Sequence, residues 1–444
     1  MTIRKAGVAK EVSATIAIYF ASYFLSYIAS VLISRLFGVQ QYSDYAVATA
    51  VLTISSSIAL LGFDKATLQY LPRYFSSQRF DLAAHYIRST FWMILLFSIS
   101  LAISISLIII LFEIKRGESM HHIILLALLL VPIVTCVDYL NKILITKKQL
   151  LNSLIVFRIQ QPFLLMIFVL GCYFFNIRSS TSLIACLAVA WIAILCFYLY
   201  WLRNDIPAFA KAKRSSVCWR AWLPRALPFW VCGIVLVTIQ NMGVLILEIL
   251  DVNAREVGIY AAVTQTCHFL IMVHTAVNIV ALPRFSEVFS YRNKTQLQNN
   301  LNDYLRVIFY FCLLFLVMVA IGGKTMLSFF GPEFVKGYST LCVLTVGSVI
   351  NVYCGLSTSL LQIAGLRRIV LRNAVLLFSI TMALMFILVP YYGMSGAAWA
   401  FSIGMLIING QQVGYLYNRL GISFFNIFVT RKTPALATPV ISSD

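Results

Sequence analysis

Long apolar segments alternate with short polar ones along the whole chain. Segments of about 20 apolar residues are long enough, as α-helices, to cross the ~30 Å hydrocarbon core of a bilayer. Twelve such spans are predicted, at 13–34, 42–62, 91–112, 122–144, 153–175, 181–202, 227–250, 258–282, 307–323, 338–363, 370–389 and 394–417. The longest connection, 63–90, leaves no room for a soluble catalytic domain. The pattern predicts an all-α integral membrane protein.

Composition agrees with this pattern. Of the 444 residues, 61% are hydrophobic and 11% are charged, whereas soluble proteins carry about 25% charged residues. The ten cysteines form no C-x-x-C pair and lie almost entirely in apolar segments, so we expect small buried hydrophobes and neither disulfides nor a metal site. The short basic start precedes an apolar segment without a small-residue cleavage site, which predicts a retained first helix.

The positive charges are distributed unequally between the two sides of the membrane. Counting connections alternately, one side carries 26 Lys and Arg and the other carries 7, with one further Arg inside a span. Basic residues accumulate on the cytoplasmic side of membrane proteins, so both termini are predicted to be cytoplasmic. Orientation and attraction to anionic lipids account for most of the net charge of +19, and no nucleic-acid partner is expected.

The connections also suggest how the chain is divided. Those at 63–90, 203–226 and 283–306 mix polar and apolar residues and are expected to form amphipathic helices at the inner interface. The basic stretch 203–226 would link an N-terminal six-helix lobe, 1–202, to a C-terminal six-helix lobe, 227–417, with a cytoplasmic tail at 418–444.

An internal repeat supports two pseudo-symmetric lobes. SDYA at 43–46 opens the second span and GIYA at 258–261 opens the eighth, and each is followed by a related exit, LPRYFS at 71–76 and LPRFS at 282–286. Both copies cross the membrane in the same direction. Parallel repeats of this kind are typical of transporters that rock about a central cleft.

Several stretches resemble the Wzx-like bacterial polysaccharide and O-antigen flippases of the multidrug/oligosaccharidyl-lipid/polysaccharide (MOP) superfamily. They are ISRLFGVQQYSDYAVATAV, LLGFDKATLQYLPRYF, EVGIYAAV, ALPRFSEVF, FFGPEFVKGYSTLCVL and LVPYYGMSGAAWAFSIG, in the family's order over essentially the whole chain. The resemblance implies a MATE-like fold in the bacterial inner membrane. It also implies alternating access that moves O-antigen, capsule or exopolysaccharide units, linked to undecaprenyl diphosphate, from the cytoplasmic to the periplasmic leaflet. A polysaccharide polymerase and a chain-length regulator are possible partners.

The chain departs from the family at two places. Asp44 stands where members often have Gly, and Gln240 and Asn241 stand in the seventh span where members often have an acidic residue. The second departure argues against cation coupling through that carboxylate. Gln240 and Asn241 remain candidates for the polar lining of the cleft, together with His268 in the eighth span.

Arg158 is the clearest candidate for contact with a charged head group. It lies in the fifth span within VFRIQQPFL, beside Gln160 and Gln161, a cluster that would be costly facing lipid and could loosen the helix locally. The alternative is a structural ion pair with Asp138, which lies at a similar depth in the neighbouring span. Lys142, four residues after Asp138, could satisfy that carboxylate instead.

Five polar residues can each be interpreted in two ways. His268 and His274 point to different faces of one helix and cannot form one metal site, so hydrogen-bonded core histidines are favoured. Glu248, near the outer end of its span, is an interfacial carboxylate or an ion-coupling group. Arg35 and Asp44 flank the outer loop FGVQQY, where related lipid II flippases have similar charges near the outer gate. They are gate residues or interfacial anchors.

The sequence contains none of the common catalytic, metal or nucleotide-binding motifs, so we expect no enzymatic activity and no cofactor. Two other functions stay open. A cation-coupled multidrug exporter of the same fold should have a smaller, more aromatic or acidic cavity. A membrane polysaccharide polymerase typically needs a long outer loop rich in Arg and His, whereas the longest outer connection here is near 324–337.

Overall fold

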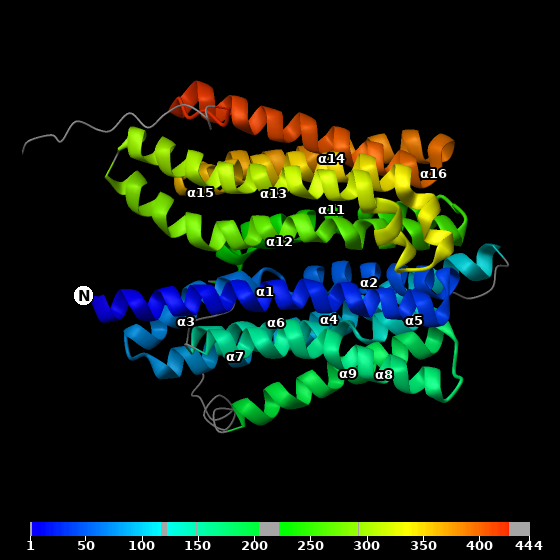
Figure 1. Cartoon of the computed structure of the whole chain (residues 1–444). Helices are drawn as coiled ribbons and strands as arrows, with labels where there is room; N and C mark the ends of the chain where they lie inside the picture. The colour runs from blue at the N-terminus through cyan, green and yellow to red at the C-terminus, as the bar shows by residue number, and fades with distance from the viewer. Residues whose placement is uncertain (1, 117–121, 148, 204–221, 292, 426–444) are drawn as a thin grey trace, which may run out of the picture.

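The structure is a computed structural model, and it describes residues 2–116, 122–147, 149–203, 222–291 and 293–425 (Figure 1). Within those ranges all regular secondary structure is helical. The first group of helices comprises α1 (Thr2–Phe37), α2 (Val39–Ala59), α3 (Phe63–Ser76), α4 (Phe80–Arg116), α5 (His122–Leu129), α6 (Val131–Thr146), α7 (Leu150–Ile155), the π-helix η1 (Val156–Gln160), α8 (Gln161–Phe174) and α9 (Ser180–Leu202). The second comprises α11 (Leu223–Ile249), α12 (Ala254–Ser290), α13 (Lys294–Ser328), the 3-10 helix η3 (Pro332–Gly337), α14 (Tyr338–Cys354), α15 (Leu356–Ile363) and α16 (Arg367–Leu420).

The number of membrane crossings agrees with the predicted twelve when the bent pair α2–α3 is counted as one span and α16 as two. Among the described residues, ten helices are long and apolar enough to span a membrane, and the bent pair α2–α3 is an eleventh. α16 has 54 residues, which as one straight helix would extend about 81 Å, far more than one bilayer. It reverses at Gly393, whose φ is +53°, so that Gly404 packs against Thr381 and Leu377. α16 therefore contains both predicted spans, 370–389 and 394–417.

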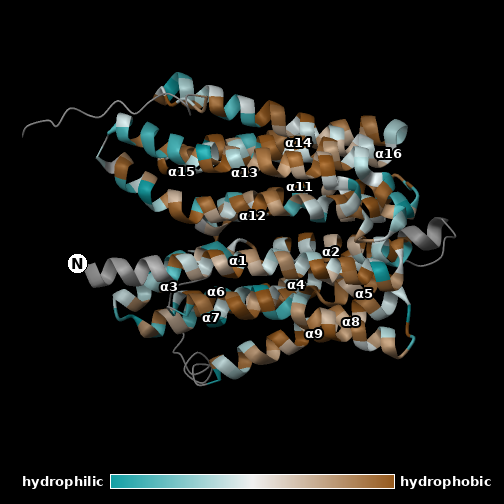
Figure 2. Cartoon of the chain, in the orientation of Figure 1, coloured by the Kyte–Doolittle hydropathy of each residue, from teal (hydrophilic) through white to brown (hydrophobic). Residues whose placement is uncertain are grey.

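The surface confirms a membrane-embedded bundle. Figure 2 shows hydrophobic residues along most of each helix and hydrophilic residues gathered toward the two ends of the bundle. Large apolar side chains are exposed along the middle of several helices, among them Leu96, Ile103, Leu314, Ile321 and Leu406. Exposed apolar side chains on this scale are expected where the solvent is lipid.

One of the three connections predicted to form interfacial helices, 63–90, contains a separate short helix. α3 is a separate helix after Gly62, which has a φ of +76° and lies against the backbone of Ala226 and Trp230, so that a side chain there would collide. The expectation for 283–306 is wrong, because α12 and α13 continue through it as extensions of membrane helices. The break between them is confined to a short turn before Asn293, whose side chain caps α13. Residues 204–221 of the third connection lie outside the described residues.

The helices form two lobes, as predicted from the repeat. α1–α9 make an N-terminal lobe and α11–α16 a C-terminal lobe (Figure 1). The start of α11 nevertheless packs into the N-terminal lobe. Trp222 is 2% exposed, its Nε1 donates to the Tyr74 hydroxyl at 3.0 Å, and its ring meets Tyr86 at 4.9 Å. The Nε1 of Trp230 donates to the Ile58 carbonyl at 2.8 Å. The C-terminal lobe thus begins with a helix anchored in its neighbour.

The bundle has two ends, which we name by what they carry. The terminal face carries the start of α1, helix α3, the starts of α11 and α16 and the end of α16 at Leu420; it lies at the left of Figure 1. The far face carries the turns at Gly38, Asn176, Asp251 and Gly393. The side chains of Gln298 and Tyr353 hold the stretch after α16 against the terminal face, through hydrogen bonds to the backbone of Ser423 and Phe424.

Candidate transport cavity

A cavity of about 1140 Å³ lies within the C-terminal lobe, is bordered on the side of the N-terminal lobe by α3, and reaches the terminal face. Lys65 and Gln69 of α3, Pro224 at the start of α11 and Arg368 at the start of α16 line its mouth. Its inner end is lined by polar groups of α11 and α12, including Gln240 and His268. The cavity therefore extends from one end of the bundle toward its middle.

The charge of this cavity is one-sided. Of the described residues that line it, Lys65 and Arg368 are basic and none is Asp or Glu. The Lys65 ammonium reaches across to α11, where a Cβ at Gly233 would lie 3.8 Å from Nζ. Neither Lys65 nor Arg368 forms an ion pair with another described residue. Two uncompensated cations at the mouth of a low-dielectric cavity favour an anion there.

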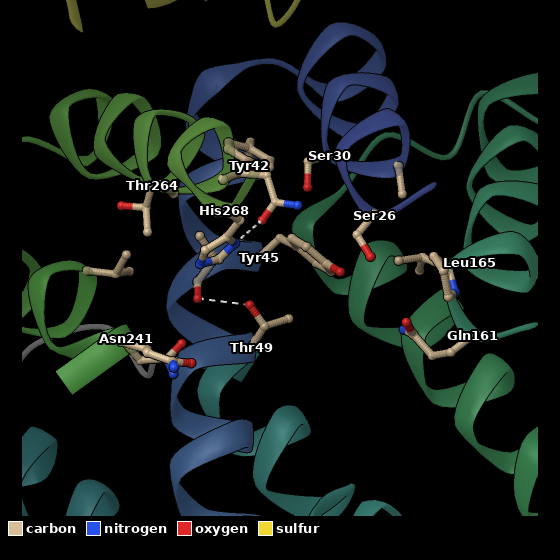
Figure 3. Close-up of a pocket in the computed structure, with 17 residues that line it drawn as sticks. Ser26, Ser30, Tyr42, Tyr45, Thr49, Gln161, Leu165, Asn241, Thr264 and His268 are labelled. Atoms are coloured by element: carbon tan, nitrogen blue, oxygen red, sulfur yellow. Dashed lines mark hydrogen bonds between the residues drawn. The ribbon is translucent and has the colours of Figure 1, made fainter. Parts of the chain in front are cut away.

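A smaller cavity of about 210 Å³ lies deeper between the lobes (Figure 3). Its walls come from both lobes, with α1, α2 and α8 on one side and α11 and α12 on the other. The polar residues that line it are Ser26, Ser30, Tyr42, Tyr45, Thr49, Gln161, Gln240, Asn241, Thr264, Gln265 and His268. Gln240, Thr264 and His268 line both cavities. The two cavities are thus adjacent sections of one polar path.

Four of the predicted cleft residues meet at the smaller cavity. Gln161 lies on the wall opposite Asn241 in Figure 3, and His268 lies between the lobes. The His268 Nδ1 and Gln265 Oε1 are 3.1 Å apart. The Asn241 amide donates to the Val237 carbonyl at 2.9 Å. His268 is thus hydrogen-bonded within its own helix and also lines both cavities.

Arg158 and Gln160 are placed elsewhere. Both lie in the π-helix η1, because Pro162 has no N–H to bond the Arg158 carbonyl and the helix loosens there, as the sequence suggested. The Arg158 guanidinium lies 5.1 Å from the ring centroid of Tyr19 in α1 and 5.9 Å from that of Phe157. Neither Arg158 nor Gln160 is among the described residues that line the two cavities. Aromatic faces satisfy this cation instead.

Asp138 does not form an ion pair with Arg158 in the described part of the chain. It lies half-buried in α6, where the charges that act on it are those of Lys142, Asp64 and Arg158. Glu248 lies one residue before the end of α11, at the far face. Neither carboxylate is among the described residues that line the cavities.

At the far face the lobes are joined by a set of hydrogen bonds that we call the latch. Arg35, in the last turn of α1, donates from Nε to the Phe329 carbonyl at 2.7 Å and from Nη2 to the Ser328 carbonyl at 2.6 Å. Ser34 donates to the Phe330 carbonyl at 3.1 Å, and Tyr27 to the Met326 carbonyl at 3.2 Å. The Met326 and Ser328 carbonyls lie in the last turn of α13 and those of Phe329 and Phe330 follow it directly, at a helix end where a cation is favourable.

Arg35 and Asp44 do not contact each other. Asp44 instead accepts a hydrogen bond from the Ser180 hydroxyl of α9 at 2.5 Å, within its own lobe. Beside the latch, Tyr42 packs against the rings of Phe330 and Phe334, with centroids 6.2 Å and 6.0 Å away. The far face is therefore closed by α1 and α2 against the end of α13, while the terminal face holds the open mouth.

Sequence reasoning did not identify the residues at the mouth of the large cavity or many of those in its wall. Lys65 and Arg368 have the sequence context of ordinary basic residues in cytoplasmic connections. Asn373 and Gln412 also line the cavity. They are amides inside apolar spans, and polar residues within a span generally face the protein interior, which is the signal that could have identified them.

The chain is similar to known proteins both in sequence and in fold. Residues 8–289 match the family described as "Polysaccharide biosynthesis protein". A Shigella flexneri protein, named as a candidate O-antigen transporter, is 22% identical over 259 residues. That alignment covers 56% of this chain and 58% of the relative, so the match spans little more than half of either protein.

Solved structures share the fold along nearly the whole chain. A multidrug resistance MATE transporter in an inward-facing conformation superposes with a TM-score of 0.72 at 15% identity, covering 93% of this chain and 98% of that one. A MOP superfamily transporter from Pyrococcus furiosus superposes with a TM-score of 0.64 at 14% identity, covering 94% and 96%. The expected MATE-like fold is confirmed. With a family match over residues 8–289, more than half of its length, this chain belongs to the polysaccharide biosynthesis protein family.

Proposed function

We propose that the protein is a flippase for oligosaccharides linked to undecaprenyl diphosphate in the bacterial inner membrane. The observation that carries the proposal is the charge of the large cavity, in which Lys65 and Arg368 are the only charged residues among those described. A diphosphate carries negative charge that hydrocarbon excludes, and such a cavity would shelter it. The family match and the Shigella flexneri relative support the same substrate class.

In this proposal the terminal face is cytoplasmic, as the bias of 26 to 7 basic residues favours. The cavity then opens to the cytoplasm while the latch closes the periplasmic side, which is a loading state. The lipid chains would remain in the bilayer while the head group enters between the lobes. Transport would follow when the latch opens and the mouth closes.

Topology is tested by reporter fusions at described turns. Fusions after Ser179 and Asn253 are expected to report a periplasmic location, and one after Lys147 a cytoplasmic one, because these turns lie at opposite ends of the bundle. Alkaline phosphatase and fluorescent-protein fusions measure this directly. Reversed signals at all three turns would mean that the cavity opens to the periplasm and that the loading state described above is wrong.

The other predicted residues have secondary roles in this scheme. Gln161, Gln240, Asn241 and His268 would contact the head group on its way through the smaller cavity. Arg35 would help close the periplasmic side. Asp44, Asp138 and Glu248 remain candidates for gating or ion coupling, and Arg158 for positioning α1 against η1. The proposal invokes no cofactor, no metal and no bond-breaking step. The basic residues of the terminal face would attract anionic lipids.

A multidrug exporter is the second candidate, because the solved neighbours include multidrug MATE transporters. A cationic drug is best stabilised by acidic groups, whereas the described cavity lining has none. The cavity therefore favours the flippase. A polymerase is less favoured, because it would need polar catalytic groups on an outer loop. A polymerase and a chain-length regulator would instead be partners that act on the flipped product.

The direct test is transport by the purified protein in liposomes. Lipid-linked oligosaccharide placed in one leaflet is expected to become accessible in the other, measured by cleavage with a glycosidase added outside. A cationic dye such as ethidium, loaded into the same vesicles under a sodium or proton gradient, should not be moved faster than in protein-free vesicles. Dye transport without glycan transport would reject the flippase in favour of the exporter.

A further inference from the structure

The wall of the large cavity formed by the C-terminal lobe differs from its mouth. It carries amide, hydroxyl and imidazole groups and, among the described residues deeper than Arg368, no charge. We call it the amide wall and define it by His274, Asn278, Thr358, Asn373, Asn409 and Gln412. All but Asn278 line the cavity directly, and Asn278 is hydrogen-bonded to two residues that do.

One turn of α15 connects most of this wall. The Ser357 and Thr358 hydroxyls donate to Gln412 Oε1 at 2.8 Å and 2.9 Å. The Ser359 hydroxyl donates to Asn278 Oδ1 at 2.8 Å. Both amide oxygens are thereby occupied, so each amide nitrogen points elsewhere. The NH₂ group of Gln412 has no hydrogen-bond partner among the described residues.

The amide nitrogen of Asn278 fixes the tautomer of His274. Asn278 Nδ2 lies 2.7 Å from His274 Nε2. An amide nitrogen can only donate, so Nε2 accepts and the proton of the neutral ring is on Nδ1. The ring packs against Gly355, where a side chain would leave no room for it, and the Val352 backbone carbonyl is an acceptor for its proton. His274 is therefore a fixed part of the wall.

Asn373 is the most unusual member of the wall. It is 1% exposed, and neither its Nδ2 nor its Oδ1 has a hydrogen-bond partner. A buried amide left in this state destabilises the fold unless a bound molecule supplies the missing hydrogen bonds. In the hairpin of α16, Gly404 packs against Thr381, and the same antiparallel register brings Asn373 level with Gln412. Unused donors and an unused acceptor are thus gathered on one wall.

The chemistry of this wall matches an uncharged sugar. A pyranose presents several hydroxyls that both donate and accept, together with apolar C–H faces. Asn373 offers a donor and an acceptor, and Gln412 offers a donor. Phe401 and Met405 line the cavity beside them and provide apolar surface. Few precisely placed polar groups on an apolar wall are typical of small-molecule sites.

The position of the wall also matches the layout of a lipid-linked glycan. Arg368 and Asn373 lie on the same helix, five residues apart, which is about 7.5 Å along its axis. Arg368 is at the mouth and Asn373 is deeper. A sugar attached directly to a diphosphate held at the mouth would reach the depth of Asn373 and Gln412.

We infer that the amide wall is a carbohydrate subsite that binds the sugar next to the diphosphate, while Lys65 and Arg368 hold the diphosphate itself. This inference rests on the proposed function. It assigns recognition of the sugar to the C-terminal lobe, and it gives hydrogen-bond partners to the buried amide of Asn373.

The test compares two probes on the whole protein in nanodiscs: undecaprenyl diphosphate, and the sugar-bearing carrier extracted from membranes of the native host. Native mass spectrometry measures both dissociation constants. Wild type is expected to bind the sugar-bearing carrier about tenfold or more tightly than the bare one. Asn373→Leu and, separately, Gln412→Met should reduce this preference about tenfold each, because each removes hydrogen bonds to the sugar. Binding of the bare carrier should stay within about twofold.

Two control variants separate the possible causes. Thr381→Val lies on the same helix and removes a buried hydroxyl that also lacks a partner, but Thr381 packs on Gly404 and does not line the cavity, so both constants should be unchanged. Lys65→Gln should weaken both probes equally.

The outcomes separate this inference from the proposed function. If wild type binds neither probe, the proposed function fails. If it binds both probes equally, or if Asn373→Leu and Gln412→Met weaken both probes alike, the carrier is recognised but the sugar subsite is overturned. Thermal unfolding of each variant identifies any that fails to fold, in which case the other variant decides.

Discussion

Replacing Gly258 with leucine is expected to hold the far face open and to stop transport. Gly258 lies in α12, where a Cβ would sit 2.6 Å from the Val39 carbonyl oxygen and 3.1 Å from Val39 Cγ2 of the opposite lobe. A backbone carbonyl within the first turn of α2 cannot swing aside as a flexible side chain can. The overlap is therefore relieved only by separating the lobes. Overpacking of this kind costs about 1–3 kcal/mol, enough to shift a two-state equilibrium about tenfold to a hundredfold.

Pulsed electron paramagnetic resonance measures this shift. Spin labels at Gln40 and Thr325, which are exposed on the two lobes near the far face, should move apart in Gly258→Leu in a cysteine-depleted background. Gly322→Leu is the matched control, because a Cβ at Gly322 meets nothing within 4 Å. Arg35→Met removes two latch hydrogen bonds without adding bulk at the interface and should shift the distances less. Unchanged distances and full transport in Gly258→Leu would show that the far face does not open at this contact.

Reversing the charge of Lys65 and Arg368 together should reduce glycan flipping more than a hundredfold. The double variant Lys65→Glu, Arg368→Glu turns a mouth that attracts anions into one that repels them. Unit charges 4 Å apart interact by about 4 kcal/mol at an effective dielectric constant of 20. Arg368 is exposed, so screening by salt lowers its share, and Lys65, which is half-buried, should contribute more.

The initial rate of glycan transport in liposomes measures this effect, with surface polysaccharide in complemented cells as a second readout. Arg372→Glu is the matched control, since Arg372 is exposed on the same helix but does not line the cavity. Lys65→Arg should retain most of the rate. Transport at the wild-type rate by the double variant would remove the observation on which the proposed substrate rests.

Much of the fold could be predicted because membrane insertion is a local property. Each span was identified from the summed transfer free energy of about 20 neighbouring residues, which needs no knowledge of partners. The same holds for the helix defect at Arg158, because Pro162 acts on the carbonyl four residues before it. The point at which a helix ends outside the membrane is not set by transfer free energy, and the extension of α12 and α13 into 283–306 was missed for that reason.

The side that each helix turns toward the cavity was decided only by tertiary structure. In water, a helix marks its buried face with apolar residues, but lipid is as apolar as leucine, so hydrophobic periodicity does not distinguish the lipid face from the protein face. Arg158 therefore looked like a cleft residue and instead lies over Tyr19, while Lys65 looked like any basic residue of a connection.

Long-range contacts could not be predicted from the sequence either. Arg35 was placed at the outer end of the first span with Asp44 as its nearest possible partner, yet it bonds to carbonyls 293 and 294 residues away. Such carbonyls belong to every helix end and carry no sequence signal. The sequence by itself determined that the chain crosses the membrane as a two-lobed helical bundle with biased charge. Tertiary structure alone decided which polar groups share one cavity, because that depends on the rotation of each helix and on which lobe it meets.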